Sequence, residues 1–174
     1  IESSLLFLKN LEVNKKDSHS YNVVIVIGHL WELVKREVES CYRGVVKFAH
    51  QEKLLGTGDA VRVSIPFLDD QTEQILVVCG DIPLVKERTF LNLYESHLSA
   101  ENDITVLAVR MDNPFGYGRL ITNSHGDLLA VREESDETND EKKIKTINSG
   151  LYCINRVFLE KALEFMDRDN VQNE

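Results

Sequence analysis

The sequence predicts an α/β fold with a mixed, mostly parallel sheet flanked by helices. Strand-like and helical segments alternate along most of the chain, which is the order that produces parallel sheets covered by helices. Segments 23–27 and 74–79 are almost wholly apolar, as is typical of strands that are buried on both faces. Two short strand-like segments around the turn at 124–127 predict an additional antiparallel hairpin.

The expected elements follow from the spacing of the apolar residues. Apolar residues recur at helical spacing in four segments, which we expect to be helices: 1–12, 30–41, 87–98 and 157–166. Apolar runs or alternation bounded by turn residues predict seven strands: 23–27, 45–48, 74–79, 103–110, 119–122, 128–131 and 151–154. The acidic stretch 133–141 is for the most part typical of a solvated loop.

Length and composition fit one soluble domain. The chain has 174 residues, of which 43% are hydrophobic and 28% are charged, enough for one core but too few for two ordinary domains. No apolar run is long enough to predict a transmembrane helix. The net charge of −9 at pH 7 argues against a nucleic-acid partner. Three widely spaced cysteines favour a reducing, cytoplasmic location.

Ligands bind open α/β sheets at the carboxyl ends of the strands, so the residues after each strand are site candidates. Gln51 follows the strand at 45–48 and offers an amide that can pair with a nucleobase edge. Gly56 lets the backbone approach a ligand closely. Thr57 can cap a helix over 58–63 and leave backbone N–H groups for an anion. By themselves these residues fit a plain loop with a helix cap better than a site.

Gly80 and Asp81 follow the buried strand at 74–79 directly. A carboxylate at the ligand end of a sheet suits Mg²⁺, which prefers one or two carboxylates together with substrate phosphates. Capping of the next turn explains Asp81 equally well.

A third candidate combines the loop 113–118, which ends at Gly118, with two later polar residues. Glu133 and Asn148 have side chains suited to holding sugar hydroxyls. Taken one at a time, a β-turn, a surface charge and a turn asparagine are stronger explanations of these residues.

In this order, the motifs resemble those of the sugar nucleotidyltransferases. The chain reads Gln-x-x-x-Leu-Gly-Thr-Gly-x-Ala from Gln51, Gly-Asp-x-Pro-Leu from Gly80 and Asn-Pro-x-Gly-Tyr-Gly-Arg from Asn113, with Glu133 and then Ile-Asn-Ser-Gly from Ile147. The combination is similar, over nearly the whole chain, to the uridylyltransferase domain of bacterial N-acetylglucosamine-1-phosphate uridylyltransferases. The resemblance implies a Rossmann-like nucleotidyltransferase fold.

The resemblance also implies a reaction and a site. The reaction is uridylyl transfer from UTP to N-acetylglucosamine 1-phosphate, which gives UDP-N-acetylglucosamine for cell-envelope precursors and pyrophosphate, with Mg²⁺ as cofactor. By position, the uracil edge is read at Gln51 with Gly56 and Thr57 beside it, the metal is bound at Asp81 next to Gly80, and the sugar is held by Gly118, Glu133 and Asn148. Parent proteins of this family form homotrimers through a C-terminal acetyltransferase domain.

Several family features are missing from the sequence. The first strand with its Gly-rich triphosphate loop and the late asparagine that serves as second metal ligand have no counterpart, so we expect residues 1–174 to be part of a uridylyltransferase domain, incomplete at both ends. Asp59 and Ser135 stand where the family usually has His and Lys. Two alternatives stay open: a related sugar-1-phosphate nucleotidyltransferase, or a fragment that binds ligand without catalysis.

Overall fold

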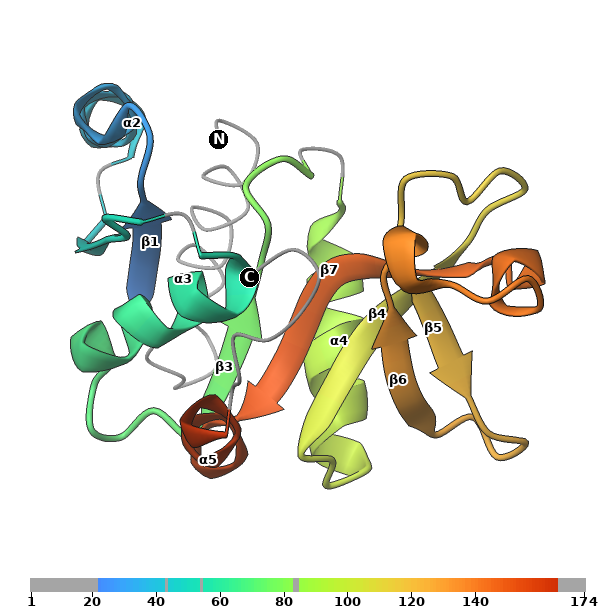
Figure 1. Cartoon of the computed structure of the whole chain (residues 1–174). Helices are drawn as coiled ribbons and strands as arrows, with labels where there is room; N and C mark the ends of the chain where they lie inside the picture. The colour runs from blue at the N-terminus through green and yellow to red at the C-terminus, as the bar shows by residue number, and fades with distance from the viewer. Residues whose placement is uncertain (1–21, 43, 54, 83–84, 166–174) are drawn as a thin grey trace.

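The strands of the protein form two sheets in the part that its structure describes. The structure is a computed structural model that describes residues 22–42, 44–53, 55–82 and 85–165, and Figure 1 shows its elements. The first sheet holds β1 (Val23–Ile27) and β2 (Val46–His50), which pair in parallel along their whole lengths. The helix expected over 1–12 lies outside the described residues.

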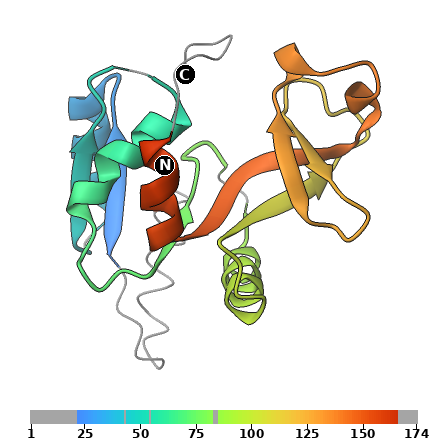
Figure 2. The ribbon, with the colours of Figure 1, turned by 60° about the horizontal axis from the view of Figure 1, so that its bottom comes forward.

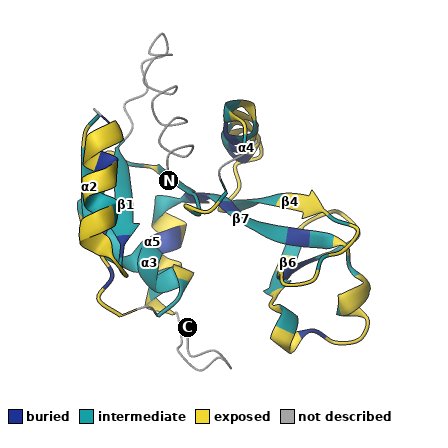
Figure 3. Cartoon of the chain, turned by 90° about the horizontal axis from the view of Figure 1, so that it is seen from above, coloured by how far each residue is buried: buried dark blue, intermediate teal, exposed yellow. Residues whose placement is uncertain are grey.

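Helix α2 (Trp31–Cys41) connects the two parallel strands, as a parallel pair requires. It packs on them through Val38, which is buried beside Ile25 and Phe48. Most of α2 is exposed, as Figure 3 shows. This amphipathic pattern is the one that the spacing of apolar residues predicts.

The second sheet is built around the long strand β7 (Thr146–Asn155). Strands β3 (Gln74–Val77) and β4 (Ile104–Arg110) both pair with β7 in antiparallel fashion, and both reach its residues 152–154. They therefore occupy opposite edges of β7 and run in the same direction. Helix α4 (Glu87–Ser99) lies between them in the chain.

The predicted hairpin extends the second sheet. Strands β5 (Arg119–Thr122) and β6 (Leu128–Arg132) pair antiparallel, and the first residue of β5 also pairs with Ile147 of β7. Figure 2 shows β7 running from the end beside α5 (Arg156–Glu164) to the hairpin at the other side of the molecule.

The core of the second sheet lies under α4. Phe90 and Leu93 of this helix pack on Leu151 and Cys153 of β7, and all four side chains are buried. The side chain of Asn155 accepts a hydrogen bond from the backbone N–H of Phe158 at 3.2 Å and so caps α5. Within the described ranges, no helix has both the length and the apolar character needed to cross a membrane.

The mixed α/β architecture is confirmed, but less of it is parallel than expected. Within the described residues, the pairing of β1 with β2 is parallel and the pairings of β7 and of the hairpin are antiparallel. The reason is the connection from β4 to β7, which holds the hairpin and short 3₁₀ turns. Without a long crossover helix there, the chain returns alongside β4 in the opposite direction.

Candidate functional site

The second sheet has a gap in its strand pairing along one edge of β7. β3 ends opposite Tyr152 and β5 begins opposite Ile147. β4 pairs with both of these residues of β7, so it occupies the other edge, and β3 and β5 share one edge. We call the interval between Tyr152 and Ile147 the pairing gap. The segment that leaves β3 carries Gly80 and Asp81, and the segment that enters β5 carries Gly118. These two segments therefore begin at opposite limits of the pairing gap.

β7 itself is irregular inside the pairing gap. Gly150 has a φ of +75°, a conformation that favours glycine, and the register with β4 shifts here. Oδ1 of Asn148 accepts a hydrogen bond from the backbone N–H of Gly150 at 3.0 Å, and Nδ2 of Asn148 donates to the hydroxyl of Tyr152. In a regular strand these two residues would lie about 13 Å apart. The bulge is therefore what brings Asn148 and Tyr152 into contact.

The structure brings together the three residues that the resemblance assigns to the sugar. The backbone N–H of Asn148 donates to the carbonyl oxygen of Gly118 at 2.8 Å. A Cβ atom on Gly118 would lie 3.1 Å from Oε1 of Glu133, so any other residue at this position would require the Glu133 carboxylate to shift by a few tenths of an ångström. We call Gly118, Glu133 and Asn148 the sugar group, after the part of the ligand that the resemblance implies.

Cys79 connects the end of β3 to the bulge. Its Sγ lies 3.4 Å from the carbonyl oxygen of Gly150, and a Cβ atom on Gly150 would lie only 2.8 Å from that sulfur. Burial raises the pKa of the Cys79 thiol, and the nearby Asp81 carboxylate raises it further. The thiol is therefore protonated at neutral pH, and its contribution is to pack β3 against the bulge close to Asp81.

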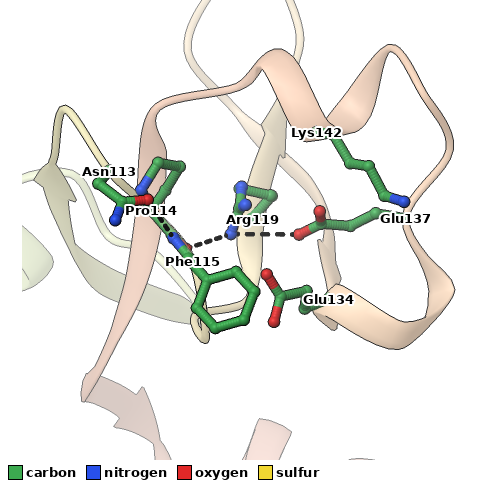
Figure 4. Close-up of a pocket in the computed structure, with 7 residues that line it drawn as sticks. All are labelled: Asn113, Pro114, Phe115, Arg119, Glu134, Glu137 and Lys142. Atoms are coloured by element: carbon green, nitrogen blue, oxygen red, sulfur yellow. Dashed lines mark hydrogen bonds and ion pairs between the residues drawn. The ribbon is translucent and has the colours of Figure 1, made fainter.

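Arg119 and Glu137 form a buried ion pair next to the sugar group. Nη1 of Arg119 lies 3.2 Å from Oε1 of Glu137, and the two side chains are 4% and 0% exposed. The same Nη1 donates to the carbonyl oxygens of Pro114, at 2.7 Å, and of Tyr117. The pair lines an open hollow of about 440 Å³ together with Asn113, Phe115, Glu134 and Lys142. Figure 4 shows how these side chains lie. The pair thus ties the loop that enters β5 to the segment that follows β6.

That segment contains two short 3₁₀ turns, η2 (Glu134–Asp136) and η3 (Glu141–Lys143). Of the six carboxylates in 133–141, three are exposed, two are partly exposed and only Glu137 is buried, which fits the solvated loop expected for most of this stretch. Glu137 departs from that expectation because Arg119 gives its carboxylate a buried partner.

A second group of candidate residues lies at the carboxyl end of β2. Gln51 is buried, and its Nε2 donates to the carbonyl oxygen of Gly56 at 3.1 Å and to Oδ2 of Asp59 at 3.0 Å. Both amide hydrogens are therefore in use, and in the described part of the chain no residue donates to its Oε1. The Gln51 side chain can accept a hydrogen bond from a ligand but has none left to donate.

Gly56 and Thr57 complete this second group, which we call the nucleobase group. The cap predicted at Thr57 is wrong: α3 (Thr57–Ser64) begins at this residue, and Gly56 occupies the cap position without a side-chain hydrogen bond. Gly56 has φ and ψ of 93° and 179°, a conformation open to glycine, which makes it the residue that turns the chain into the helix. No contact between the nucleobase group and the sugar group is seen among the described residues.

The sequence matches the nucleotidyl transferase family model over residues 4–174. The chain belongs to the nucleotidyl transferase family. It is 39% identical over 164 residues to the bifunctional protein GlmU of Clostridioides difficile, a match that covers 94% of this chain and 34% of that protein. It is 40% identical over 151 residues to the GlmU of Streptococcus gordonii, covering 87% of this chain and 32% of that protein. The chain thus spans about a third of the length of these curated relatives.

Solved structures with low sequence identity share the fold of this nucleotidyl transferase. HddC from Yersinia pseudotuberculosis, complexed with GMP-PN, has a TM-score of 0.66 at 18% identity and covers 99% of this chain and 67% of its own. CMP:2-keto-3-deoxy-manno-octonic acid synthetase, complexed with CTP, has a TM-score of 0.67 at 13% identity, covering 95% and 68%. These likenesses confirm the nucleotidyltransferase fold that the resemblance implies.

Asp81 has an environment that fits a magnesium ligand. Its side chain is exposed at the carboxyl end of β3, and no described residue forms an ion pair with it. The described part of the chain holds no cluster of three or more His, Cys, Asp or Glu, so a site built wholly from protein ligands has no basis here. Mg²⁺ binds through one or two carboxylates, waters and phosphates, and one exposed aspartate fits that pattern. The alternative role of Asp81, capping of the next turn, depends on residues 83–84, which lie outside the described residues. Both the metal ligand and the cap therefore remain explanations of Asp81.

Three residues that shape the two groups are not singled out as site residues from the sequence alone. Asp59 is noted there only as a departure from the family, and Glu137 is one carboxylate among many, which gives no signal. Tyr152 has a signal in its surroundings. Asn-Ser-Gly from Asn148 is typical of an asparagine turn that ends in a positive-φ glycine, and such a turn within a strand indicates a bulge.

Proposed function

We propose that the parent protein transfers a uridylyl group from UTP to N-acetylglucosamine 1-phosphate. The observation that carries this proposal is the contact between Gly118, Glu133 and Asn148, which come from three separate segments and meet at the pairing gap. All three stand where the resemblance puts the residues that hold the sugar. Similarity to GlmU proteins over most of the chain supports the same function.

The chemistry of this reaction needs positioning more than it needs a base. A phosphate oxygen of the sugar phosphate attacks the α-phosphorus of UTP, the bond to the bridging oxygen breaks, and pyrophosphate leaves. The attacking phosphate is already ionised near neutral pH, so the protein has to align the two substrates and neutralise charge. Asp81 would hold a Mg²⁺ ion, which supplies positive charge to the phosphates when it is bound.

Gln51 supports uracil as the base. Its amide hydrogens are held by Gly56 and Asp59, so the side chain offers an acceptor. Uracil carries an N–H donor at ring position 3, whereas cytosine has an acceptor there. An acceptor at Gln51 therefore favours UTP over CTP.

Pyrophosphate release by the full-length parent protein tests this function. We expect release with UTP, N-acetylglucosamine 1-phosphate and Mg²⁺, and much slower release with CTP or with glucose 1-phosphate. Faster turnover with another sugar 1-phosphate would favour the related-transferase alternative. No release with any pair of substrates would favour a protein that only binds ligand.

Asp81→Asn tests the metal site in the same assay. We expect kcat to fall by at least about 100-fold with unchanged folding, because an amide binds Mg²⁺ more weakly than a carboxylate does. Asp70→Asn, an exposed aspartate in the turn before β3, is the matched control and should retain full activity. Near-normal turnover of Asp81→Asn would remove the metal role. The homotrimer and the cytoplasmic location stay predictions for the parent protein.

A further inference from the structure

The amide of Asn148 is fixed from both ends inside the pairing gap. The backbone N–H of Gly150 donates to Oδ1 at 3.0 Å, which identifies that atom as the oxygen. Nδ2 must then be the donor to the hydroxyl oxygen of Tyr152. Each end of the amide keeps one further hydrogen-bonding capacity, one hydrogen on Nδ2 and one lone pair on Oδ1. The two internal bonds decide in which direction these remaining capacities point.

The two bonds to Asn148 come from different sources. The Gly150 N–H belongs to the backbone of the bulge and is present whatever the side chains are. The Tyr152 hydroxyl is the only side-chain partner of the Asn148 amide among the described residues. Replacing tyrosine by phenylalanine removes this hydroxyl and nothing else. Without it, rotation of the amide would no longer be opposed at the nitrogen end.

The Tyr152 hydroxyl is well suited to a fixed, uncharged role. Its side chain is half-buried, and burial raises the pKa of this phenol, an effect that the Cys79 thiol and the Glu133 carboxylate reinforce and the Asn148 bond opposes. The phenol therefore stays neutral across the physiological range. Its oxygen therefore accepts from Nδ2 of Asn148 throughout that range.

We infer that Tyr152 is a positioning residue for sugar recognition: it orients the Asn148 amide so that its free hydrogen and lone pair face the sugar phosphate. This inference rests on the proposed function, in which Asn148 holds the sugar. It adds a residue that the motifs do not include and that reaches the site only because the bulge at Gly150 shortens β7. The nucleobase group lies in the loop after β2 and at the start of α3, so Tyr152 should matter for the sugar phosphate and not for the recognition of UTP.

Tyr152→Phe in the full-length parent protein is the direct test, because it removes the hydroxyl and keeps the ring. We expect KM for N-acetylglucosamine 1-phosphate to rise roughly tenfold, the scale of one lost hydrogen bond, with KM for UTP and the unfolding temperature nearly unchanged. Tyr94→Phe is the matched control, since Tyr94 is a partly buried tyrosine that packs against the core under α4. An unchanged KM for the sugar phosphate in Tyr152→Phe would overturn the inference, and so would an equal rise in both KM values.

A double-mutant cycle shows whether Tyr152 acts through Asn148. In an Asn148→Ala background, Tyr152→Phe should change KM for the sugar phosphate less than twofold, because the group it orients is gone. A full tenfold effect in that background would mean that the hydroxyl touches the sugar itself, which contradicts a positioning role.

A crystal structure of the Tyr152→Phe parent protein without substrate separates this inference from the proposed function. We expect the Asn148 amide to rotate or to occupy more than one orientation. An amide in its wild-type orientation would overturn the inference even if the enzyme makes UDP-N-acetylglucosamine. A wild-type protein that fails to turn over UTP would overturn the proposed function, while a rotated amide would still support the role of Tyr152.

Discussion

The nucleobase group and the sugar group are built in different ways. Gln51 is held by Gly56 and Asp59, which follow it within one loop and the first turn of α3. The sugar group joins the loop before β5, the residue that follows β6 and the first part of β7, and its contacts connect positions as far apart as Gly118 and Asn148. The first group is a local arrangement, whereas the second exists only when the second sheet is assembled. Packing changes around the hairpin and β7 should therefore alter sugar binding more than recognition of the nucleobase.

Glu137→Ala should have the largest effect and tests the dependence of the sugar group on tertiary packing. The change leaves Arg119 buried without its carboxylate, and breaking a buried pair in this way costs about 3 kcal/mol of stability. We expect a lower urea midpoint for the parent protein and a raised KM for the sugar phosphate, with KM for UTP unchanged.

Lys143→Ala is the control for this change. It removes an ion pair with Asp140 whose side chains are 76% and 90% exposed, and solvent-exposed pairs contribute little. The urea midpoint of this variant should match the wild type. A Glu137→Ala protein as stable as Lys143→Ala would mean that the buried pair does not support the loop that enters β5.

Gly150→Ala should have the next largest effect because it changes the glycine at the centre of the bulge. The new methyl group would lie 2.8 Å from Sγ of Cys79, and the φ of +75° adds strain. We expect a loss of about 2 kcal/mol in stability and a weaker interaction with the sugar phosphate. Gly126→Ala is matched in strain, with a φ of +90°, but has nothing within 4 Å of the new methyl group.

The difference between these two glycine variants isolates the contact with Cys79. Adding Cys79→Ala to Gly150→Ala should recover part of the lost stability, since the smaller side chain makes room for the methyl group. If Gly150→Ala and Gly126→Ala lose the same amount, the strain alone explains the loss and the contact with β3 contributes nothing.

The same difference between local and assembled structure explains how far the sequence predicts the molecule. Apolar spacing predicts the helices and strands because each depends on nearby residues, as in α2 with its buried Val38. The direction of β7 depends on the length of the connection from β4, which apolar spacing does not report. Thr57 is predicted as a cap because its side chain suits that position, yet Gly56 takes the position because the chain turns there with φ and ψ that glycine adopts readily.

The candidate site divides in the same way. Gln51, Asp81 and Asn148 stand in motifs that the sequence displays directly. The partners that orient two of them, Asp59 and Tyr152, emerge only from the structure. A side chain that orients another leaves no fixed spacing in the sequence when a bulge or a helix turn sets the distance between them.

Asp59→Ala probes the nucleobase group and should raise KM for UTP by roughly fivefold. The reason is that Gln51 loses one of the two acceptors that hold its amide hydrogens, at 3.0 Å, and a net hydrogen-bond contribution of about 1 kcal/mol corresponds to a factor of this size. Discrimination between UTP and CTP should fall as well, because a rotated amide can offer hydrogens to a base. Asp70→Ala is the control, and KM for the sugar phosphate should not respond to either change. A rise in KM for the sugar phosphate with Asp59→Ala would contradict the separation of the two groups.

Thiol labelling of the wild-type protein should show the smallest effect. It compares cysteines near the two sheets without any mutation. Cys41 is exposed at the end of α2, whereas Cys153 is buried in β7 and the partly buried Cys79 follows the end of β3. Burial raises the pKa of Cys79 and raises that of Cys153 to about 11. Since the thiolate is the reactive form, a pKa of about 11 leaves roughly one thiolate per thousand Cys153 residues at pH 8.

We therefore expect iodoacetamide at pH 8 to modify Cys41 first, with Cys79 slower and Cys153 slowest, as peptide mass spectrometry can follow. The sign of the pH dependence is fixed: raising the pH increases the thiolate fraction and speeds labelling of Cys79 and Cys153. Gly150→Ala should speed labelling of Cys79 and leave Cys41 unchanged, because it separates β3 from the bulge. Labelling of Cys79 at the rate of Cys41 in the wild type would mean that the contact between Cys79 and the bulge at Gly150 opens readily in solution.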